Sequence, residues 1–213
     1  MHSSLRMEIA LASENSITRA IDVLHHGGVI AHATETCYGL ACDLRDPKAV
    51  ERLFLIKKRS FDQPVSAMFS SIEEAQKFVV FSKQALETAK KFLPGPLTIV
   101  LPMRSDAPFP IHVCPPSPTP IPNPTIGIRI SSSPFAQSLV FSFGSPIATT
   151  SANLHGKPNT YSVSDIESQF LGMETVPDLV LDSGVLSLAP PSTVAEIVGD
   201  RVKVLRQGDV RLR

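Results

Sequence analysis

The sequence predicts a single α/β (or α+β) domain built on a twisted sheet of parallel and antiparallel strands with flanking helices. Two observations predict this fold class: apolar runs of strand length alternate with segments of helical periodicity, and the alternation departs from strict βαβ order. In addition, 213 residues, 43% of them hydrophobic, are enough for one substantial core. There is no internal repeat or dividing linker, so we expect one domain over residues 1–213, with its core at about 14–208.

Helix signals recur along the chain as capping residues that precede apolar residues at helical spacing. Ser13 opens the first such segment, and Gly27-Gly28 ends it. Asp46-Pro47 supplies an N-cap followed by proline at the first helical position. We expect helices within residues 13–28, 46–57, 71–79, 82–93, 133–142 and 163–170.

Short apolar runs bounded by turn residues predict the strands. We expect them at residues 29–33, 65–69, 97–101, 125–130, 146–150, 179–182, 193–198 and 202–206. Gly199-Asp200 has the composition of a hairpin turn between the last two strands. Residues 34–40 are predicted to form a polar loop after the first strand.

A proline-rich stretch interrupts this alternation. Residues 94–124 contain 11 of the chain's 19 prolines. Proline removes a backbone donor, so 108–124 is predicted to be neither helix nor central strand but an exposed loop. We assign it to an insertion at about 105–124, which acts either as a lid or as idle surface.

The bulk composition excludes several classes of protein. Twenty basic and 20 acidic residues give zero net charge, so no long-range attraction to nucleic acid or anionic membrane is predicted. No apolar run approaches the roughly 20 residues of a membrane span. Three cysteines with no metal spacing fit a reduced, cytoplasmic protein.

Sequence motifs for familiar nucleotide and metal sites are absent. There is neither a G-x-x-x-x-G-K-[ST] loop nor a G-x-G-x-x-G turn, and the six histidines do not cluster. His25 and His26 are interpreted as helix capping. Cys37 near His32 raises the possibility of a thiol nucleophile, but a small, partly buried residue is the favoured interpretation because no third group orients the pair.

Local cationic positions predict an anion-binding site instead. Lys57-Lys58-Arg59 ends a predicted buried helix and carries more charge than ordinary C-terminal capping requires. In an extended segment Lys57 and Arg59 would share one face, and Lys58 would point to solvent. Arg129 lies within an apolar strand, so it requires a partner, which is either a nearby carboxylate side chain or a bound carboxylate or phosphate.

Seven segments in order along the chain resemble the YrdC-like family, whose members make threonylcarbamoyl-AMP for tRNA modification. The run Thr34-Glu35-Thr36-Cys37-Tyr38-Gly39-Leu40 is similar to the family's P-T-E-T-x-Y-G-L, with Ala33 in place of the proline. The other segments match its K-x-R, G-P-L-T, arginine-strand, S-x-N, S-T-V and R-x-G motifs; they are 57–59, 94–98, 126–129, 151–153, 192–194 and 206–208.

The resemblance implies a large positive cavity and a reaction of L-threonine, bicarbonate or CO2, and ATP that yields threonylcarbamoyl-AMP and pyrophosphate, with Mg²⁺ assisting. It implies that Lys57 and Arg59 are catalytic. By the same resemblance, the threonine-binding residues are Thr36, Arg129, Thr149 and Ser192. The nucleotide-binding residues are Arg59, Gln63, Thr125, Ser151, Asn153, Asn159 and Arg206, and no metal ligand is assigned.

The resemblance also implies a partner that transfers the product to position 37 of tRNA. Two alternatives remain. One is a non-catalytic module that binds nucleotide or double-stranded RNA, against which neutral net charge counts. The other is a carbamoyl-transferase accessory domain of the hydrogenase-maturation type, and the absence of zinc-finger cysteines and of an acylphosphatase segment counts against it.

Overall fold

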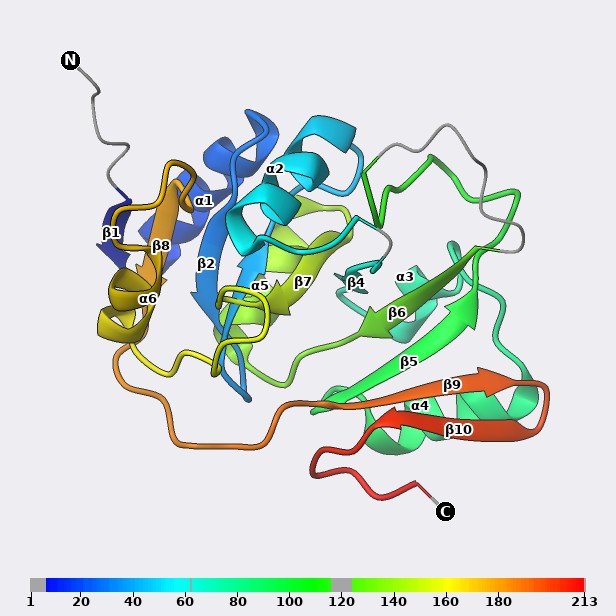
Figure 1. Cartoon of the computed structure of the whole chain (residues 1–213). Coiled ribbons are helices and arrows are strands. Elements are labelled where there is room, and N and C mark those ends of the chain that lie inside the picture. The colour runs from blue at the N-terminus through cyan, green and yellow to red at the C-terminus, as the bar shows by residue number, and fades with distance from the viewer. Residues whose placement is uncertain (1–6, 62, 116–123, 213) are drawn as a thin grey trace.

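The computed structural model describes residues 7–61, 63–115 and 124–212 and shows helices on both faces of a sheet (Figure 1). The strands are β1 Glu8–Leu11, β2 Ile30–Ala33, β3 Tyr38–Ala41, β4 Ser66–Met68, β5 Leu97–Pro102, β6 Thr125–Arg129, β7 Ile147–Ser151, β8 Leu179–Asp182, β9 Thr193–Val198 and β10 Arg201–Arg206. The helices are α1 Glu14–His25, α2 Pro47–Lys57, α3 Ile72–Ala75, α4 Lys83–Phe92, α5 Pro134–Phe143 and α6 Val163–Phe170.

The strands of the described residues form one ten-stranded sheet in the order β1-β8-β2-β3-β7-β4-β6-β5-β9-β10. Parallel pairing joins β1 to β8, β8 to β2, β4 to β6 and β5 to β9. The remaining neighbours, including the β9–β10 hairpin at Gly199, pair antiparallel. The mixed sheet predicted from the sequence is therefore confirmed.

Side-chain caps start the helices where the sequence predicts them. The Ser13 hydroxyl accepts from the backbone of Ser16, and the Asp46 carboxylate accepts from the backbone of Lys48. Ser133 caps α5 in the same way, and proline follows both Asp46 and Ser133 at the first turn. Each cap satisfies an amide that has no partner within its helix, which fixes where the helix begins.

Two strands were not predicted. β3 lies inside the stretch expected to be a polar loop, yet all four of its residues are buried between β2 and β7. Only residues 34–37 remain as loop. β1 precedes the predicted core boundary at residue 14 and pairs with β8 at the edge of the sheet. The sheet thus begins earlier in the chain than the helix signals indicate.

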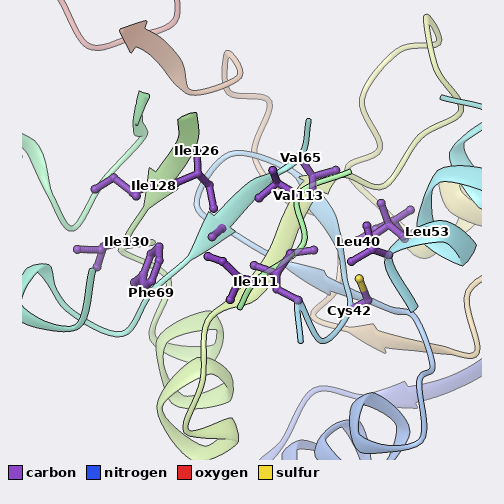
Figure 2. Close-up of a cluster of buried hydrophobic side chains, with 14 of the residues drawn as sticks. Leu40, Cys42, Leu53, Val65, Phe69, Ile111, Val113, Ile126, Ile128 and Ile130 are labelled. Carbon is purple, nitrogen blue, oxygen red and sulfur yellow. The ribbon is translucent and has the colours of Figure 1, made fainter. Parts of the chain in front are cut away.

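The hydrophobic core has one large and one small cluster. The large cluster spans the molecule, and Figure 2 shows part of it between β3, β4, β6 and α2. Ile111 and Val113 belong to it, each 7% exposed, and the Val65 amide donates to the Val113 carbonyl. The prediction of an exposed loop is therefore wrong for residues 111–113, and residues 116–123 of that loop lie outside the described residues. The smaller cluster joins α1 and α5 to β2 and β8.

Alternation along the strands leaves part of one sheet face open. On β6, Ile126 and Ile128 enter the large core, whereas Gly127 and Arg129 line a cavity. On β4, Ser66 lines the same cavity and Met68 joins the cluster under α1 and α5. Side chains two apart share a face, so the cavity lies on the face that these two helices cover elsewhere.

Candidate active site

The cavity has a volume of about 430 Å³, which is within the range of small-ligand sites. It crosses the middle of the sheet and receives residues from loops on both sides. Nine of the residues predicted from the sequence line it: Thr36, Arg59, Thr125, Arg129, Thr149, Ser151, Asn159, Ser192 and Arg206. Lys57, Gln63 and Asn153 are not among the lining residues.

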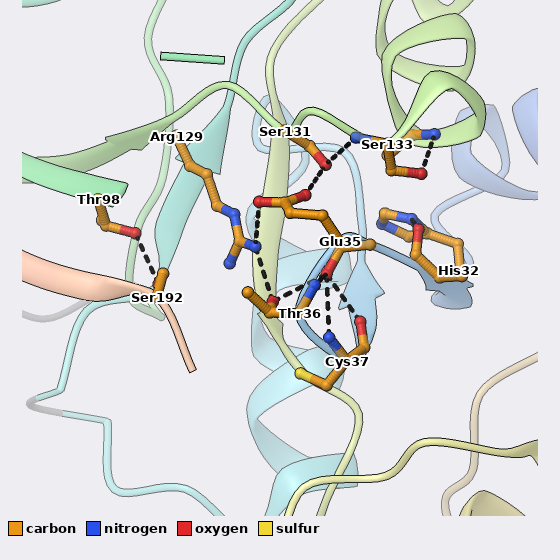
Figure 3. Close-up of polar contacts among 12 residues, drawn as sticks. His32, Glu35, Thr36, Cys37, Thr98, Arg129, Ser131, Ser133 and Ser192 are labelled. Carbon is orange, nitrogen blue, oxygen red and sulfur yellow. Dashed lines mark hydrogen bonds and ion pairs between the residues drawn. The ribbon is translucent and has the colours of Figure 1, made fainter. Parts of the chain in front are cut away.

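The loop after β2 is shaped by one threonine. The Thr34 hydroxyl donates to the Cys37 carbonyl at 2.7 Å and accepts from the Thr36 and Cys37 amides. Hydroxyl groups commonly close turns in this way. The turn presents Thr36 to the cavity and Glu35 to β6 (Figure 3).

Arg129 is a buried cation at the end of the cavity near the loop after β2. Its Nη2 donates to Glu35 Oε1 at 2.9 Å and to Thr36 Oγ1 at 2.8 Å, so it does have a carboxylate side chain as partner (Figure 3). Burial alone would raise the pKa of Glu35, but the Arg129 charge and the Ser131 hydroxyl hold it below its usual value. The Arg129 Nε is buried and has no hydrogen-bond partner among the described residues, so one donor of the guanidinium is unsatisfied there.

A second arginine is attached to the start of β9. Arg206 donates through Nε and Nη2 to the Ser192 carbonyl, at 3.1 and 2.9 Å, and through Nη2 to the Ser192 hydroxyl at 3.0 Å. Ser192 also contacts Thr98 Oγ1 at 3.2 Å. These bonds connect β10 to the end of the cavity formed by β5 and β9, and Arg206 itself lines the cavity.

Lys57 and Arg59 do not share a face, because the segment is not extended. The helix continues to Lys57, and Lys58 adopts a left-handed conformation with φ of 51°. Lys57 is 2% exposed, and its Nζ donates to the Ser151 carbonyl at 2.5 Å and to the carbonyl and Oδ1 of Asn153 at 2.8 and 3.0 Å. Lys57 therefore supports the turn after β7, and Lys58 is exposed, as predicted.

The Ser151–Asn153 turn is held by its own hydrogen bonds and also reaches the cavity. The Ser151 hydroxyl donates to Asn153 Oδ1 at 2.6 Å, and the Asn153 amide nitrogen donates to the Lys157 carbonyl. Ser151 also lines the cavity, whereas Asn153 is buried behind it. In this structure Asn153 acts through the position of Ser151.

Arg59 lies at the cavity wall, half-buried. Its Nε donates to the Gln63 carbonyl at 2.8 Å and its Nη2 to the Pro64 carbonyl at 3.0 Å. Burial, with a contribution from Arg206, lowers the pKa of Arg59. Gln63 contributes its backbone to this loop, and the residue is exposed.

His32 and Cys37 are both buried, which agrees with a structural role for this pair. Burial lowers the pKa of His32 to about 4, and its Nδ1 contacts the Ala33 carbonyl at 3.1 Å. Burial raises the pKa of the Cys37 thiol, although the residue borders the cavity. A raised thiol pKa disfavours the reactive thiolate.

Three features in or beside the cavity were not assigned a role from the sequence. Glu35 belongs to a quoted motif, but nothing in the sequence pairs it with Arg129. Glu196 is the acidic residue of the cavity wall. A Cβ on Gly127 would lie 2.5 Å from Ser66 Oγ and 2.9 Å from Thr98 Cγ2, so the floor is open only with glycine there. Glycine inside a strand often marks such a close approach, and this signal was available in the sequence.

The described residues are 7–61, 63–115 and 124–212. In those ranges, no group of three or more His, Cys, Asp and Glu side chains is arranged to hold a metal ion. None of the helices found there has the length and apolarity needed to cross a bilayer.

The structure thus combines an α/β sheet with a cavity lined by arginines and hydroxyl groups, which are donors that suit a small anionic ligand. Residues 22–208 match the family model Sua5_yciO_yrdC, described as "Telomere recombination", so the chain belongs to this family. A putative threonylcarbamoyl-AMP synthase from Methanocaldococcus jannaschii is 31% identical over 88% of this chain and 83% of its own length. A threonylcarbamoyl-AMP synthase from Photobacterium profundum is 30% identical over 91% of this chain and its whole length.

Solved structures agree with this assignment. The crystal structure of P. abyssi Sua5 complexed with L-threonine is 30% identical and covers 94% of this chain with a TM-score of 0.79; this chain spans 56% of its length. The crystal structure of E. coli YciO is 26% identical, covers 95% of both chains and has a TM-score of 0.80. Both share the mixed sheet described above.

Proposed function

We propose that this chain is an L-threonylcarbamoyladenylate synthase, which condenses L-threonine, bicarbonate or CO2, and ATP into threonylcarbamoyl-AMP and pyrophosphate. The observation that carries the proposal is the convergence of Arg59, Arg129 and Arg206 on one cavity. Membership of a family with relatives named threonylcarbamoyl-AMP synthase supports the same reaction.

Each end of the cavity suits a different substrate. Arg129, with Thr36, Thr149 and Ser192, offers a charged donor and three hydroxyls, which fits the carboxylate and hydroxyl of threonine. The nucleotide is assigned to Arg59, Thr125, Ser151, Asn159 and Arg206. Gln63 and Asn153 are assigned to support of that half, through the Arg59 loop and the Ser151 turn.

The reaction brings several anions together. The threonine amine loses a proton and adds to the carbon of CO2, which gives a carbamate; its oxygen attacks the α-phosphorus of ATP, and the bond to pyrophosphate breaks. Arg59 and Arg206, which both line the cavity, would screen the repulsion and stabilise charge on the leaving group. Lys57, which is buried beside the cavity, acts by holding Ser151. A cavity that holds the carbamate next to the nucleotide also shortens the time before the two react, so less carbamate is lost to water.

We treat Mg²⁺ as part of the nucleotide substrate. This ion keeps several waters and binds nucleotide phosphates with one or two carboxylates. The acid on the cavity wall, Glu196, fits that donor set. When bound, the ion would supply positive charge to the phosphates.

The product contains a labile carbamate–phosphate anhydride, so we place the protein in the cytoplasm beside a transferase that delivers the threonylcarbamoyl group to position 37 of tRNA. The alternative of a non-catalytic module for double-stranded RNA is not favoured, because similar proteins over most of this chain are named synthases. Direct contact with tRNA would show as binding that weakens steeply with salt.

The test is to incubate the purified chain with ATP, L-threonine and labelled bicarbonate and to measure threonylcarbamoyl-AMP and pyrophosphate. Formation of both products in equal amounts is expected. Intact, folded protein that makes neither product would refute the proposal. Omission of threonine is the control, since pyrophosphate released without it would indicate simple hydrolysis.

Replacement of Arg59 by alanine tests the cavity assignment. We expect turnover to fall to background, because a cation beside the phosphates is lost. The Arg59 side chain bonds two carbonyls of its own loop, so the free energy of unfolding should fall by only about 1 kcal/mol. If the variant unfolds instead, Arg59 is mainly a structural residue.

A further inference from the structure

The hydrogen bonds of Arg129 limit how it can bind a carboxylate. Its Nη2 has two hydrogens, and the structure gives this nitrogen two acceptors, Glu35 Oε1 and Thr36 Oγ1 (Figure 3). Its Nε is buried and has no partner among the residues that the structure describes. Both Nη2 hydrogens are therefore used, whereas the Nε hydrogen lacks an acceptor in this part of the chain.

A carboxylate binds arginine most strongly through two parallel hydrogen bonds. Either such fork uses Nη2, together with Nε or with Nη1. With both Nη2 hydrogens occupied, a substrate carboxylate can form the fork only if Glu35 or Thr36 releases its bond. One of these two contacts must therefore be exchangeable.

Glu35 is the more firmly held of the two acceptors. Its second oxygen, Oε2, accepts a hydrogen bond from Ser131, a residue with no exposed surface. It is paired to Arg129 as a charged group, and charge-assisted hydrogen bonds are roughly twice as strong as neutral ones. In Figure 3 the Glu35 side chain extends from the loop after β2 and lies between Ser131 and the guanidinium of Arg129.

Thr36 is the contact that can be exchanged. Its hydroxyl is neutral and borders the cavity. It also contacts Thr34 Oγ1 at 3.0 Å, and since the Thr34 hydrogen goes to the Cys37 carbonyl, Thr36 is the donor there. The Thr36 hydroxyl therefore keeps a hydrogen-bond partner when its bond from Arg129 is lost.

We infer that Glu35, held by Ser131, is a positioning residue that fixes the Arg129 guanidinium, while the substrate carboxylate replaces the Thr36 hydroxyl on Nη2 and engages Nε. This inference rests on the proposed use of L-threonine. It assigns Glu35 to recognition of the amino-acid carboxylate, not of ATP. The opposite role for Glu35 would be to neutralise the charge of Arg129 and so weaken threonine binding.

Two substitutions of Glu35 separate position from charge. Glu35→Ala removes the acceptor, so Arg129 is no longer held, and we expect the KM for L-threonine to rise about tenfold, with the KM for ATP unchanged within about twofold. Glu35→Gln keeps an acceptor of the same shape without the charge, and its KM for threonine should stay within about twofold of wild type. An unchanged or lower KM for threonine in Glu35→Ala would overturn the inference.

Direct binding distinguishes this inference from the proposed function. Titration calorimetry with L-threonine, and with L-threoninol, which lacks the carboxylate, needs no turnover. Wild type that neither binds threonine nor forms product refutes the proposed function. Wild type that binds threonine, together with a Glu35→Ala variant of equal threonine affinity, refutes only the role of Glu35.

A less invasive variant covers the case in which Glu35→Ala does not fold. Ser131→Ala leaves the Glu35–Arg129 pair in place but removes its second anchor. We expect the KM for threonine to rise about threefold and the midpoint of thermal unfolding to stay within a few degrees of wild type. A folded Ser131→Ala variant with wild-type KM values would count against the anchored arrangement.

Discussion

Lys57 and Arg129 are both buried cations near one cavity, 2% and 8% exposed, but their partners differ. Within the described part of the chain, the three acceptors of Lys57 are neutral oxygens of Ser151 and Asn153. Arg129 is paired with the Glu35 carboxylate, and its buried Nε has no partner in that part of the chain. The hydrogen bonds of Lys57 are thus made to neutral groups. The charge of Arg129 is balanced by a carboxylate, but one of its donors lacks an acceptor among the described residues.

The difference identifies which cation is built to receive a ligand. Neutral acceptors do not repay the cost of burying a charge, and burial, together with Arg59, lowers the pKa of Lys57 to about 7. A free donor on a compensated arginine is costly unless a ligand completes it. We therefore assign Lys57 to support of the turn and Arg129 to substrate binding, although the sequence motifs place both in the site.

The largest expected effect follows from replacing Arg129. Arg129→Gln should lower kcat/KM for threonine by about two to three orders of magnitude, because a charged contact with the carboxylate is lost. It also leaves the Glu35 carboxylate without its cation, so the free energy of unfolding should fall by about 3 kcal/mol. Product formation and urea unfolding measure the two effects.

A double variant separates these effects. Glu35→Gln in the Arg129→Gln background removes the uncompensated charge, so stability should partly recover while threonine use does not. Arg104→Gln is the matched control, since the Arg104–Asp106 pair is exposed and such pairs contribute little to stability. Recovery of activity in the double variant would show that Arg129 acts only on the fold.

Much of the fold follows from local signals that the structure retains. Asp46-Pro47 and Ser133-Pro134 start helices as expected, because capping is decided within a few residues. β3 escaped prediction because four residues after a polar loop carry no period of their own. They become a strand only through pairing with β2 and β7.

The site was predicted by residue type better than by arrangement. Nine predicted residues line the cavity, but the expectation that Lys57 and Arg59 share one face depended on an extended segment. The left-handed conformation of Lys58 instead sends the two side chains to different places, and lysine is not a residue from which positive φ is expected. The Glu35–Arg129 pair joins residues 94 apart in the chain, which no local pattern records.

Replacing Lys57 tests the other side of the comparison. Lys57→Met keeps the apolar stem but leaves three buried acceptors without their donor, so the free energy of unfolding at pH 8 should fall by about 2–3 kcal/mol. The KM for ATP should rise, because Ser151 loses its support. Lys58→Met, an exposed neighbour, should change stability by less than about 0.5 kcal/mol. If the two variants are equally stable, Lys57 does not hold the turn.

The effect that is smallest over any one pH unit is a pH dependence specific to Lys57. In the folded chain its pKa is about 7, whereas in the unfolded chain lysine titrates near about 10.4. Between these values the unfolded state binds more protons, so the stability of wild type relative to Lys57→Met should rise with pH, by at most about 1.4 kcal/mol per unit. Below pH 7 both states are charged, and the difference should level off. Urea unfolding of both proteins from pH 6 to 10 measures it. A flat difference would mean that the three acceptors keep Lys57 charged throughout, which would make its site as strongly cation-binding as that of Arg129.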